Sequence, residues 1–361
     1  MRIAVLTHGI SPFGALHARA FQTLGHEVHL LSLSPCEATG SPVLVRLVGP
    51  ADFRPWETAS RLAYLRTIGP VRRAVREIRP DILFALYLSS AGVVACLSGH
   101  PRVVVSAQGS DVNTRVGSFF WRQVFRWEFA RATLIHAVSE PLAEMLRTRF
   151  GANADKLVVS PVGVDTEMLS LVDPADRPNA RRILCTRAHL PVYDQGTLVR
   201  AVARLRDRGF DVQLTFVKGA EMEQTQNLVR QHGVDDRVAF IDRYGHLELR
   251  SILAAADVYV SCSRSDGTSL SLLEAMSSGL FPVVSDIPAN RPWIEDGRSG
   301  LLFPVGDDSA LAERLAEALA MPERRAAASP INRQTVLQKG DLLTENRKLL
   351  AAFEKVLETV P

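Results

Sequence analysis

The chain has 361 residues, more than one hydrophobic core usually supports, so its length predicts two domains. Hydrophobic residues make up 47% of the chain and charged residues 22%, which is typical of a globular enzyme. No apolar run approaches the length of a membrane span, and the first apolar segment is too short and too broken for a signal peptide, so we expect a cytoplasmic protein.

The net charge of +3 is unevenly placed along the chain. Residues 1–165 hold 18 Lys or Arg against 12 Asp or Glu, a net charge of +6, and the remainder holds 24 against 27, a net charge of −3. A basic half suits phosphates, an anionic acceptor or a membrane surface, although solvated helix faces explain any single patch equally well. The four cysteines (Cys36, Cys96, Cys185, Cys262) show no paired spacing, so we expect structural thiols and neither disulfides nor zinc.

Short apolar runs alternate with helical patterns along the whole chain. The strands expected, in chain order, are 2–7, 28–33, 44–48, 82–86, 103–107, 134–138, 157–160, 182–186, 212–217, 238–241, 258–262 and 281–285. The helices expected between and after them are 14–24, 57–79, 118–131, 140–149, 195–208, 221–232, 246–255, 269–278, 308–320 and about 341–358. Strands rich in Val, Ile and Leu, separated by helices, predict parallel sheets covered on both faces.

This alternating series occurs twice, on either side of a polar, proline-broken segment at 173–179. The pattern therefore predicts an α/β protein with two Rossmann-like domains, 1–172 and 173–340, facing an interdomain cleft. The last helix, within 341–361, is expected to pack back on the first domain. Ligands of open α/β sheets bind beyond the carboxyl ends of the strands, so the residues that follow strands are the candidates for a site.

The loop after the first strand lacks a dinucleotide-binding fingerprint. Residues 9–14 contain two glycines, with Pro12 between them, and no G-x-G-x-x-G. Gly14 still suits a close approach of the backbone to a ligand, and a tight structural turn explains it equally well.

Residues 265–276 are the most informative segment of the second half. They follow the strand expected at 258–262 and begin a helix that is expected to stop at Gly279. Free backbone N–H groups and the helix dipole favour an anion at such a helix start. Asp266 and Glu274, with seven residues between them, can hold hydroxyl groups on either side of that anion. A nucleotide-sugar has this layout of ribose hydroxyls, diphosphate and sugar hydroxyls.

Ten short segments recur in a characteristic order and spacing along almost the whole chain. They are Gly25–Val28, Gly109–Val112, Ala137–Ser139, Pro161–Asp165, Leu253–Val258, Ser263–Thr268, Leu272–Met276, Gly279–Val284, Asp296–Pro304 and Asp307. No single segment is decisive, but in this order and spacing the chain resembles a GT-B glycosyltransferase of the family 4 type, also called glycosyl transferases group 1.

The resemblance implies a role for each part of the segment 265–276. Glu274 would hydrogen-bond the ribose, Asp266 would hold hydroxyls of the transferred sugar, and the backbone N–H groups of Gly267, Thr268, Ser269 and Leu270 would meet the sugar and the diphosphate. The family usually has Glu at the first position, so Asp266 marks a branch of its E-x7-E motif. Taken alone, Glu274 would be a helix-surface carboxylate; within this motif, binding is the better interpretation.

Arg187 follows the strand at 182–186, and the planar fork of an arginine suits a diphosphate. By resemblance, a lysine is expected five positions later, where this chain has Val192 within a Pro-x-Tyr ending. His189 is one candidate for the missing cation, although a lone loop histidine is more often unspecialised. Lys218 is another, with a surface lysine as the plainer alternative. The loss of one such donor costs a few kcal/mol of leaving-group stabilisation.

In the first half, Gln108 occupies a position where many relatives have histidine, and an amide cannot act as a general base. Retaining enzymes of this type are thought to need no strong protein base, because the leaving phosphate takes the acceptor proton. Gln108, Asp111 and His17 are the candidates for contacts with sugar or acceptor. A capping role explains Asp111 equally well, and His17 is either an acceptor contact or a packed histidine.

The first half also mixes arginines with aromatic residues. Arginines recur between residues 54 and 79, and 119–127 alternates aromatic residues with Arg on an expected helix. These features suit peripheral contact with the inner face of a membrane that carries a lipid-linked acceptor, but buried aromatics with solvated arginines are the more economical interpretation. No nucleic-acid-binding module is present, so we expect no nucleic-acid partner.

The sequence thus predicts a retaining glycosyltransferase that uses a UDP- or GDP-linked sugar and a saccharide, lipid-linked or small-molecule acceptor. Arg187, Asp266 and Glu274 are its principal site residues. No cofactor and no essential metal are expected, because no Asp-x-Asp motif occurs. Two alternatives stay open: a catalytically degenerate relative that acts as a binding or scaffold protein, and a nucleotide-sugar epimerase or hydrolase. Donor sugar, base, acceptor, pathway and oligomeric state are not determined by the sequence.

Overall fold

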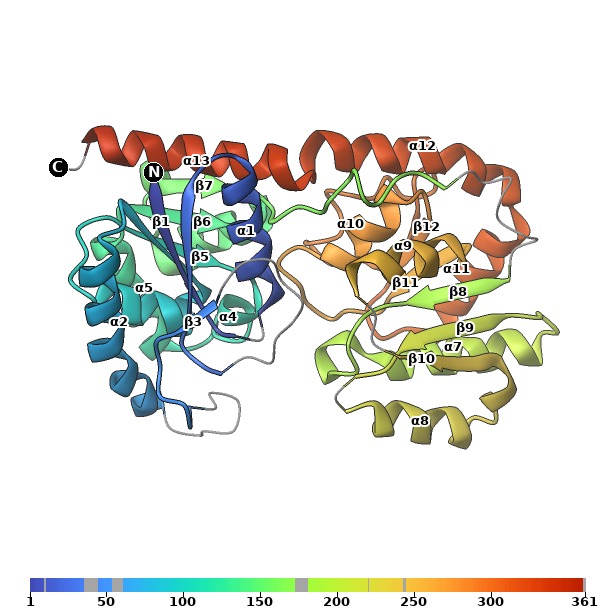
Figure 1. The fold of residues 1–361 in the computed structure, drawn as a ribbon. Helices are drawn as coiled ribbons and strands as arrows, with labels where there is room; N and C mark the ends of the chain where they lie inside the picture. Colours follow the sequence, from blue (N-terminus) through green and yellow to red (C-terminus); the bar gives the residue numbers. More distant parts are fainter. Residues whose placement is uncertain are drawn as a thin grey trace. The chain divides into compact units, whose positions relative to one another are not determined.

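The computed structural model describes residues 1–9, 11–35, 45–53, 61–172, 181–219, 221–242 and 245–359. The chain divides into two compact units, the first formed by Met1–Val162 with Leu342–Pro361 and the second by Gly163–Asp341. The division falls before the boundary expected at 172/173, so the segment that follows Val162 belongs to the second unit. Each unit holds its own parallel sheet (Figure 1).

The first unit has a seven-stranded parallel sheet in the order β3-β2-β1-β4-β5-β6-β7. Its strands are β1 (Arg2–Thr7), β2 (Glu27–Ser32), β3 (Val45–Leu47), β4 (Ile82–Leu86), β5 (Val103–Ala107), β6 (Leu134–Ala137) and β7 (Leu157–Val159). Its helices are α1 (Pro12–Thr23), α2 (Leu65–Ile78), α3 (Val93–Cys96), α4 (Ser110–Asn113), α5 (Phe119–Arg131), α6 (Glu140–Met145) and α13 (Leu342–Thr359). The strand order reverses between β1 and β4, as in a doubly wound dinucleotide-binding fold.

The second unit has a six-stranded parallel sheet in the order β10-β9-β8-β11-β12-β13. Its strands are β8 (Arg182–Cys185), β9 (Gln213–Val217), β10 (Val238–Ile241), β11 (Val258–Ser261), β12 (Phe281–Ser285) and β13 (Leu301–Phe303). Its helices are α7 (Gln195–Asp207), α8 (Met222–Gln231), α9 (His246–Ala254), α10 (Leu270–Ser277), α11 (Asp308–Ala320) and α12 (Pro322–Lys339). The topological switch point lies between β8 and β11.

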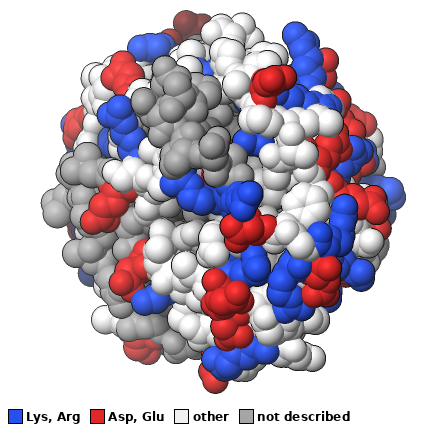
Figure 2. Space-filling view, turned by 90° about the vertical axis from the view of Figure 1, so that its right-hand side faces the viewer, with Lys and Arg blue, Asp and Glu red and all other residues white. Residues whose placement is uncertain are grey.

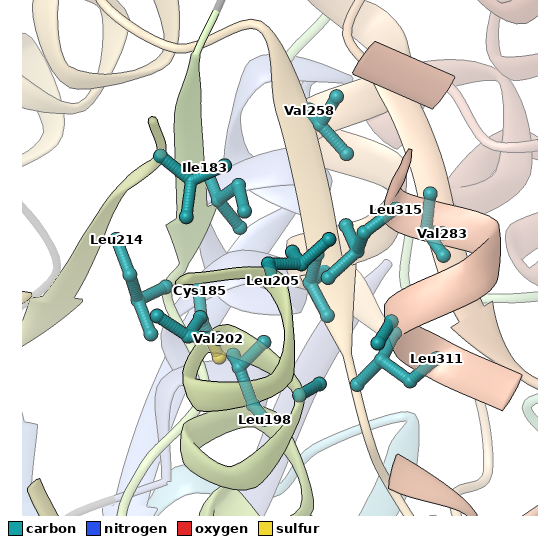
Figure 3. Close-up of a cluster of buried hydrophobic side chains, with 14 of the residues drawn as sticks. Ile183, Cys185, Leu198, Val202, Leu205, Leu214, Val258, Val283, Leu311 and Leu315 are labelled. Carbon is teal, nitrogen blue, oxygen red and sulfur yellow. The ribbon is translucent and has the colours of Figure 1, made fainter. Parts of the chain in front are cut away.

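Apolar cores cover both faces of the second sheet. On one face α7 and α11 bury a cluster that includes Leu198, Val202, Leu311 and Leu315 against the strands (Figure 3). On the other face α10 contributes Leu272, Leu273 and Met276 to a second cluster, which contains Tyr259. Burial on both faces is why these strands read as continuous apolar runs rather than alternating ones.

The C-terminal helix α13 packs on the first unit, beside α1 (Figure 1). Its Leu349 and Phe353 are fully buried in the core that holds Phe21 and Phe84. The helix α12 that precedes it was not expected, because its sequence shows no clear periodicity and contains Pro330. The strand β13 was not expected either, since it has only three residues.

Several expectations about the surface can now be judged. Within α5, Trp121, Phe125 and Phe129 are buried and only Phe119 and Phe120 are strongly exposed, so half of its aromatic residues belong to the core. On the face drawn in Figure 2, acidic and basic side chains lie interspersed, as exposed ion pairs require. No helix among the described residues combines the length and the apolar character needed to cross a bilayer.

The cysteines fit the expectation of unpaired thiols where the structure describes them. Cys96, Cys185 and Cys262 are free, and burial raises the pKa of all three. Cys36 lies outside the described residues.

Candidate functional site

The start of α10 lies at the switch point of the second sheet, after β11. Ser269 is the N-cap, and its hydroxyl accepts a hydrogen bond from the backbone N–H of Leu272 at 3.3 Å. The helix ends before Gly279, which has φ +79°. The segment therefore forms the helix start that its sequence predicts, and the dipole of α10 favours an anion there.

Arg187 extends from the end of β8 to this helix start. Its Nη1 donates to the hydroxyls of Ser269 and Ser271, both at 3.2 Å, and its Nη2 donates to Asp266 Oδ2 at 2.6 Å. The ring centroid of Tyr193 lies 3.9 Å from Arg187 Cζ. Burial opposes the charge on Arg187, but the carboxylate of Asp266 outweighs it and raises the pKa of Arg187. A permanently charged donor is thus fixed beside the helix start.

The carboxylate of Asp266 is held by groups within the site. Oδ2 pairs with Arg187, and Oδ1 accepts the backbone N–H of Gly267 at 2.9 Å. The side chains of Arg187 and Asp266 are 10% and 15% exposed, so their charges compensate each other in a largely desolvated place. Two groups expected to meet the donor, Asp266 and the Gly267 N–H, therefore contact each other in this structure.

Glu274 lies one turn into α10 and is half-buried. Its carboxyl group forms no hydrogen bond with any of the residues that the structure describes. Burial raises the pKa of Glu274 to about 7, although the charge of Arg187 acts in the opposite direction. A partly desolvated carboxyl group of this kind is poised to accept hydrogen bonds from the hydroxyl groups of a ligand.

The structure does not support His189 as a substitute for the missing cation. Its ring is buried, with Nδ1 2.9 Å from Thr225 Oγ1 and Nε2 2.9 Å from the carbonyl oxygen of Val217. Both ring nitrogens are used inside the unit, so His189 joins the loop after β8 to β9 and α8. Lys218, also considered as a cation, forms an exposed ion pair with Asp242 at 2.9 Å.

In the first unit, Asp111 fastens the ends of two neighbouring strands. Its Oδ1 accepts the backbone N–H groups of Gln108 and Gly109, and its Oδ2 accepts that of Leu88, which follows β4. Burial raises the pKa of Asp111 to about 6, and these backbone hydrogen bonds oppose that rise. The backbone N–H groups that the carboxylate accepts precede it in the chain, so Asp111 joins the ends of β4 and β5 and does not cap the turn that follows it.

Gln108 is buried at the end of β5, where its amide donates to Ser106 Oγ at 2.6 Å.

Gly14 is required by packing, because a Cβ atom there would lie 2.6 Å from Thr7 Cγ2. Gly14 lies inside α1, so its role is close packing of the helix against β1 and not the tight turn that was the alternative to a ligand contact.

His17 is a core residue and not an acceptor contact in this structure. It is 1% exposed, and its Nδ1 lies 2.6 Å from Asn346 Oδ1 of α13. Burial lowers the pKa of His17 to about 4, against the effect of the hydrogen bond that its ring donates to Asn346 Oδ1, so the ring is neutral at physiological pH. The sequence did not reveal this role because the partner lies more than 300 positions away in the chain.

Two residues of this site were not assigned from the sequence. Tyr193 lies against Arg187, and the hydroxyl of the buried Tyr259 is 2.8 Å from Ser271 Oγ. The Pro-x-Tyr ending at residues 191–193 was the signal for Tyr193. The sequence contains no signal for Tyr259, because this residue continues the apolar run of β11.

Comparison with known proteins agrees with this architecture. Residues 13–168 match the family model described as Glycosyltransferase Family 4, and residues 174–335 match Glycosyl transferases group 1. The structure of sucrose-phosphate synthase from Thermosynechococcus elongatus superimposes with a TM-score of 0.84 at 19% identity, covering 99% of this chain and 100% of that one.

Among curated relatives, a GDP-mannose-dependent alpha-(1-6)-phosphatidylinositol monomannoside mannosyltransferase of Mycolicibacterium smegmatis is 28% identical over 73% of this chain and 72% of its own length. The UDP-N-acetylglucosamine–peptide N-acetylglucosaminyltransferase GtfA subunit of Streptococcus pneumoniae is 27% identical over 58% of this chain, but the match spans only 42% of that protein. The chain therefore belongs to the GT-B fold glycosyltransferases, with a family 4 first half and a group 1 second half.

Proposed function

We propose that this protein transfers a glycosyl group from a nucleotide-sugar to a hydroxyl-bearing acceptor. The observation that carries the proposal is the arrangement at the start of α10, where Arg187, a helix N-terminus and the carboxyl group of Glu274 lie together. Arg187 and the helix start would bind the diphosphate, and Glu274 would accept hydrogen bonds from the ribose hydroxyls.

The reaction is proposed to proceed with retention at the anomeric carbon. In the first unit, Gln108 is an amide, and the carboxylate of Asp111 is used by three backbone N–H groups. Neither is suited to take a proton from an acceptor. The bond from the anomeric carbon to the phosphate oxygen would break, and the acceptor oxygen would bond to that carbon on the same face. The departing phosphate oxygen would take the proton of the acceptor hydroxyl. Arg187 would stabilise the negative charge that develops on the diphosphate.

The donor is proposed to be a UDP- or GDP-linked sugar. The names of two relatives specify UDP-N-acetylglucosamine and GDP-mannose, which supports both bases. The same names specify a peptide and a phosphatidylinositol mannoside as acceptors, so we leave the acceptor class at a saccharide, a lipid-linked molecule or a small molecule. No resident metal is needed in this proposal, because Arg187 and the helix N–H groups meet the diphosphate.

The decisive experiment is a thermal-shift screen of the full chain against UDP, GDP and ADP, followed by transfer assays with the sugars of the base that binds. We expect one base to raise the melting temperature by mass action, and Glu274→Gln to weaken that stabilisation. If no nucleotide stabilises the protein, the proposed function is wrong.

One observation favours a second candidate, a non-catalytic nucleotide-binding relative. Asp266 already compensates the charge of Arg187, and Val192 stands where the resemblance predicts a lysine. This candidate requires nucleotide binding without turnover in the presence of acceptors. Robust release of free sugar without an acceptor would instead indicate a hydrolase.

A further inference from the structure

The ring of Tyr193 occupies one face of the Arg187 guanidinium, with 3.9 Å between the ring centroid and Arg187 Cζ. Arg187 is held by Ser269, Ser271 and Asp266, and its side chain is 10% exposed. Tyr193 ends a short 3-10 turn, Pro191–Tyr193, that follows the loop after β8.

We propose that Tyr193 is a positioning residue for the donor diphosphate. Its ring holds the plane of the Arg187 guanidinium in one fixed orientation, in which the guanidinium receives a phosphate group. This inference rests on the proposed function and adds to it a residue that acts through Arg187. Tyr193 itself is not assigned a contact with the donor.

The turn that carries Tyr193 is fastened on both sides. The backbone N–H of Tyr193 donates to the carbonyl of Leu190 at 2.9 Å, and that of Arg264 donates to the carbonyl of Val192 at 2.8 Å. Asp194 follows in the left-handed region with φ +45°, and its Oδ2 accepts from Arg264 Nη2 at 2.7 Å. Because Arg264 belongs to the same loop as Asp266, the Tyr193 turn and the Asp266 loop are held as one assembly.

The position of the ring limits how an anion can reach Arg187. A guanidinium group has five N–H donors in one plane. In Arg187, Nη1 donates to Ser269 and Ser271, and Nη2 donates to Asp266. The remaining nitrogen, Nε, is buried without a partner among the described residues. With one face covered by Tyr193, an anion can reach Arg187 from the opposite face or along the open edge of its plane, and the approach in the plane gives the stronger, directional hydrogen bonds to phosphate.

The same contact explains how the site functions with one cation. Without a neighbouring lysine, Arg187 must meet the diphosphate alone and must stay in place while it also pairs with Asp266. A cation–π contact with a desolvated arginine is worth enough to hold one rotamer against that competition, and its loss should cost about 3- to 30-fold in diphosphate affinity.

The test measures by calorimetry how tightly the full chain binds a nucleoside and the matching nucleoside diphosphate. The pairs are uridine with UDP and guanosine with GDP. The variants are Tyr193→Phe, which keeps the ring, and Tyr193→Leu, which removes it. Trp127→Leu is the matched control, because the Trp127 ring lies 4.4 Å from Arg131 Cζ in the first unit, whereas β8 and α10 belong to the second.

We expect Tyr193→Leu to weaken the diphosphate about 3- to 30-fold while leaving the nucleoside unchanged, and Tyr193→Phe and Trp127→Leu to leave both unchanged. Equal weakening of nucleoside and diphosphate would show a merely structural role and overturn the inference. Unchanged diphosphate affinity in Tyr193→Leu would overturn it as well. If the unaltered protein binds neither UDP nor GDP, the proposed function itself fails, which is a different result.

Discussion

Arg187 Nη2 and Asp266 Oδ2 lie 2.6 Å apart. Arg187 follows β8 and Asp266 follows β11, the two neighbouring strands at the switch point of the second sheet. The side chains of both are largely buried, so each charge is compensated mainly by the other. A donor diphosphate must therefore share Arg187 with Asp266. Substitution of the acid and substitution of the base should have opposite effects on nucleotide binding.

Asp266→Asn should strengthen binding of the nucleoside diphosphate. The amide keeps an acceptor for the Gly267 N–H but removes a negative charge beside the expected diphosphate. Two unit charges about 4 Å apart repel by about 1 kcal/mol in a water-like dielectric, so the expected gain in affinity is at least about 3- to 10-fold. Calorimetry with UDP or GDP measures this directly. Weaker binding would mean that the main role of Asp266 is to hold Arg187 in place. Slower sugar transfer by the same variant would support the expected contact between Asp266 and the transferred sugar.

Arg187→Ala should weaken nucleoside diphosphate binding on the order of 10- to 100-fold, because a hydrogen bond to a charged group contributes about 1.5–3 kcal/mol. It also leaves Asp266 without its counter-ion next to the phosphates. Arg204→Ala is a suitable control, since Arg204 forms an exposed ion pair with Asp308. Unchanged affinity in Arg187→Ala would remove Arg187 from the donor site.

The arrangement of the second unit was largely predictable, because its strands are apolar on both faces and its helices begin after recognisable loops. The start of α10, its cap and its end at Gly279 follow from local chemistry. The errors lie where a side chain finds a distant partner. His189 looks like an exposed loop residue until Thr225 and the Val217 carbonyl are brought beside it. No spacing rule reveals such a contact, since it depends on how β9 and α8 pack.

The same limit applies in the first unit. Asp111 looked like either a ligand contact or a cap, and only the hydrogen bond from Leu88 shows that it joins two strand ends. The side chain of Tyr193 was likewise visible as part of a motif but without a role. Contacts between neighbouring residues are encoded locally, whereas contacts between strand ends require the sheet order.

Asn346→Ala should destabilise the protein without weakening nucleotide binding. Asn346 is buried, and its amide donates to the carbonyls of Val162 and Leu342 while Oδ1 contacts His17. Leaving these groups without partners should lower the free energy of unfolding by about 1–3 kcal/mol. Urea unfolding measures the loss, and UDP or GDP calorimetry below the transition serves as the control. A stability equal to that of the unaltered protein would show that α13 is anchored by its apolar contacts alone.

Chelation should leave sugar transfer unchanged. Arg187 and the N-terminus of α10 are expected to meet the diphosphate charge without a divalent ion. The measurement is transfer rate after dialysis against EDTA, with and without added Mg²⁺ or Mn²⁺. A rate that falls after EDTA and returns with either ion would contradict this expectation.

Glu274→Gln should stabilise the free protein at high pH and weaken its binding of nucleotide. The pKa of Glu274 is raised from 4.5 to about 7, so the folded protein retains a proton that the unfolded chain has lost between these values. Stability therefore falls as pH rises through this window and stays lower above pH 7. Glutamine removes that penalty, so the melting temperature should rise at pH 8 by the equivalent of about 1–2 kcal/mol and stay unchanged at pH 4.

Ribose hydroxyls donate best to the ionised carboxylate, so nucleotide binding to the unaltered protein should tighten from pH 6 to pH 8, and this pH dependence should vanish in Glu274→Gln. A variant that binds nucleotide with the same affinity and the same pH dependence as the unaltered protein would place Glu274 outside the donor site.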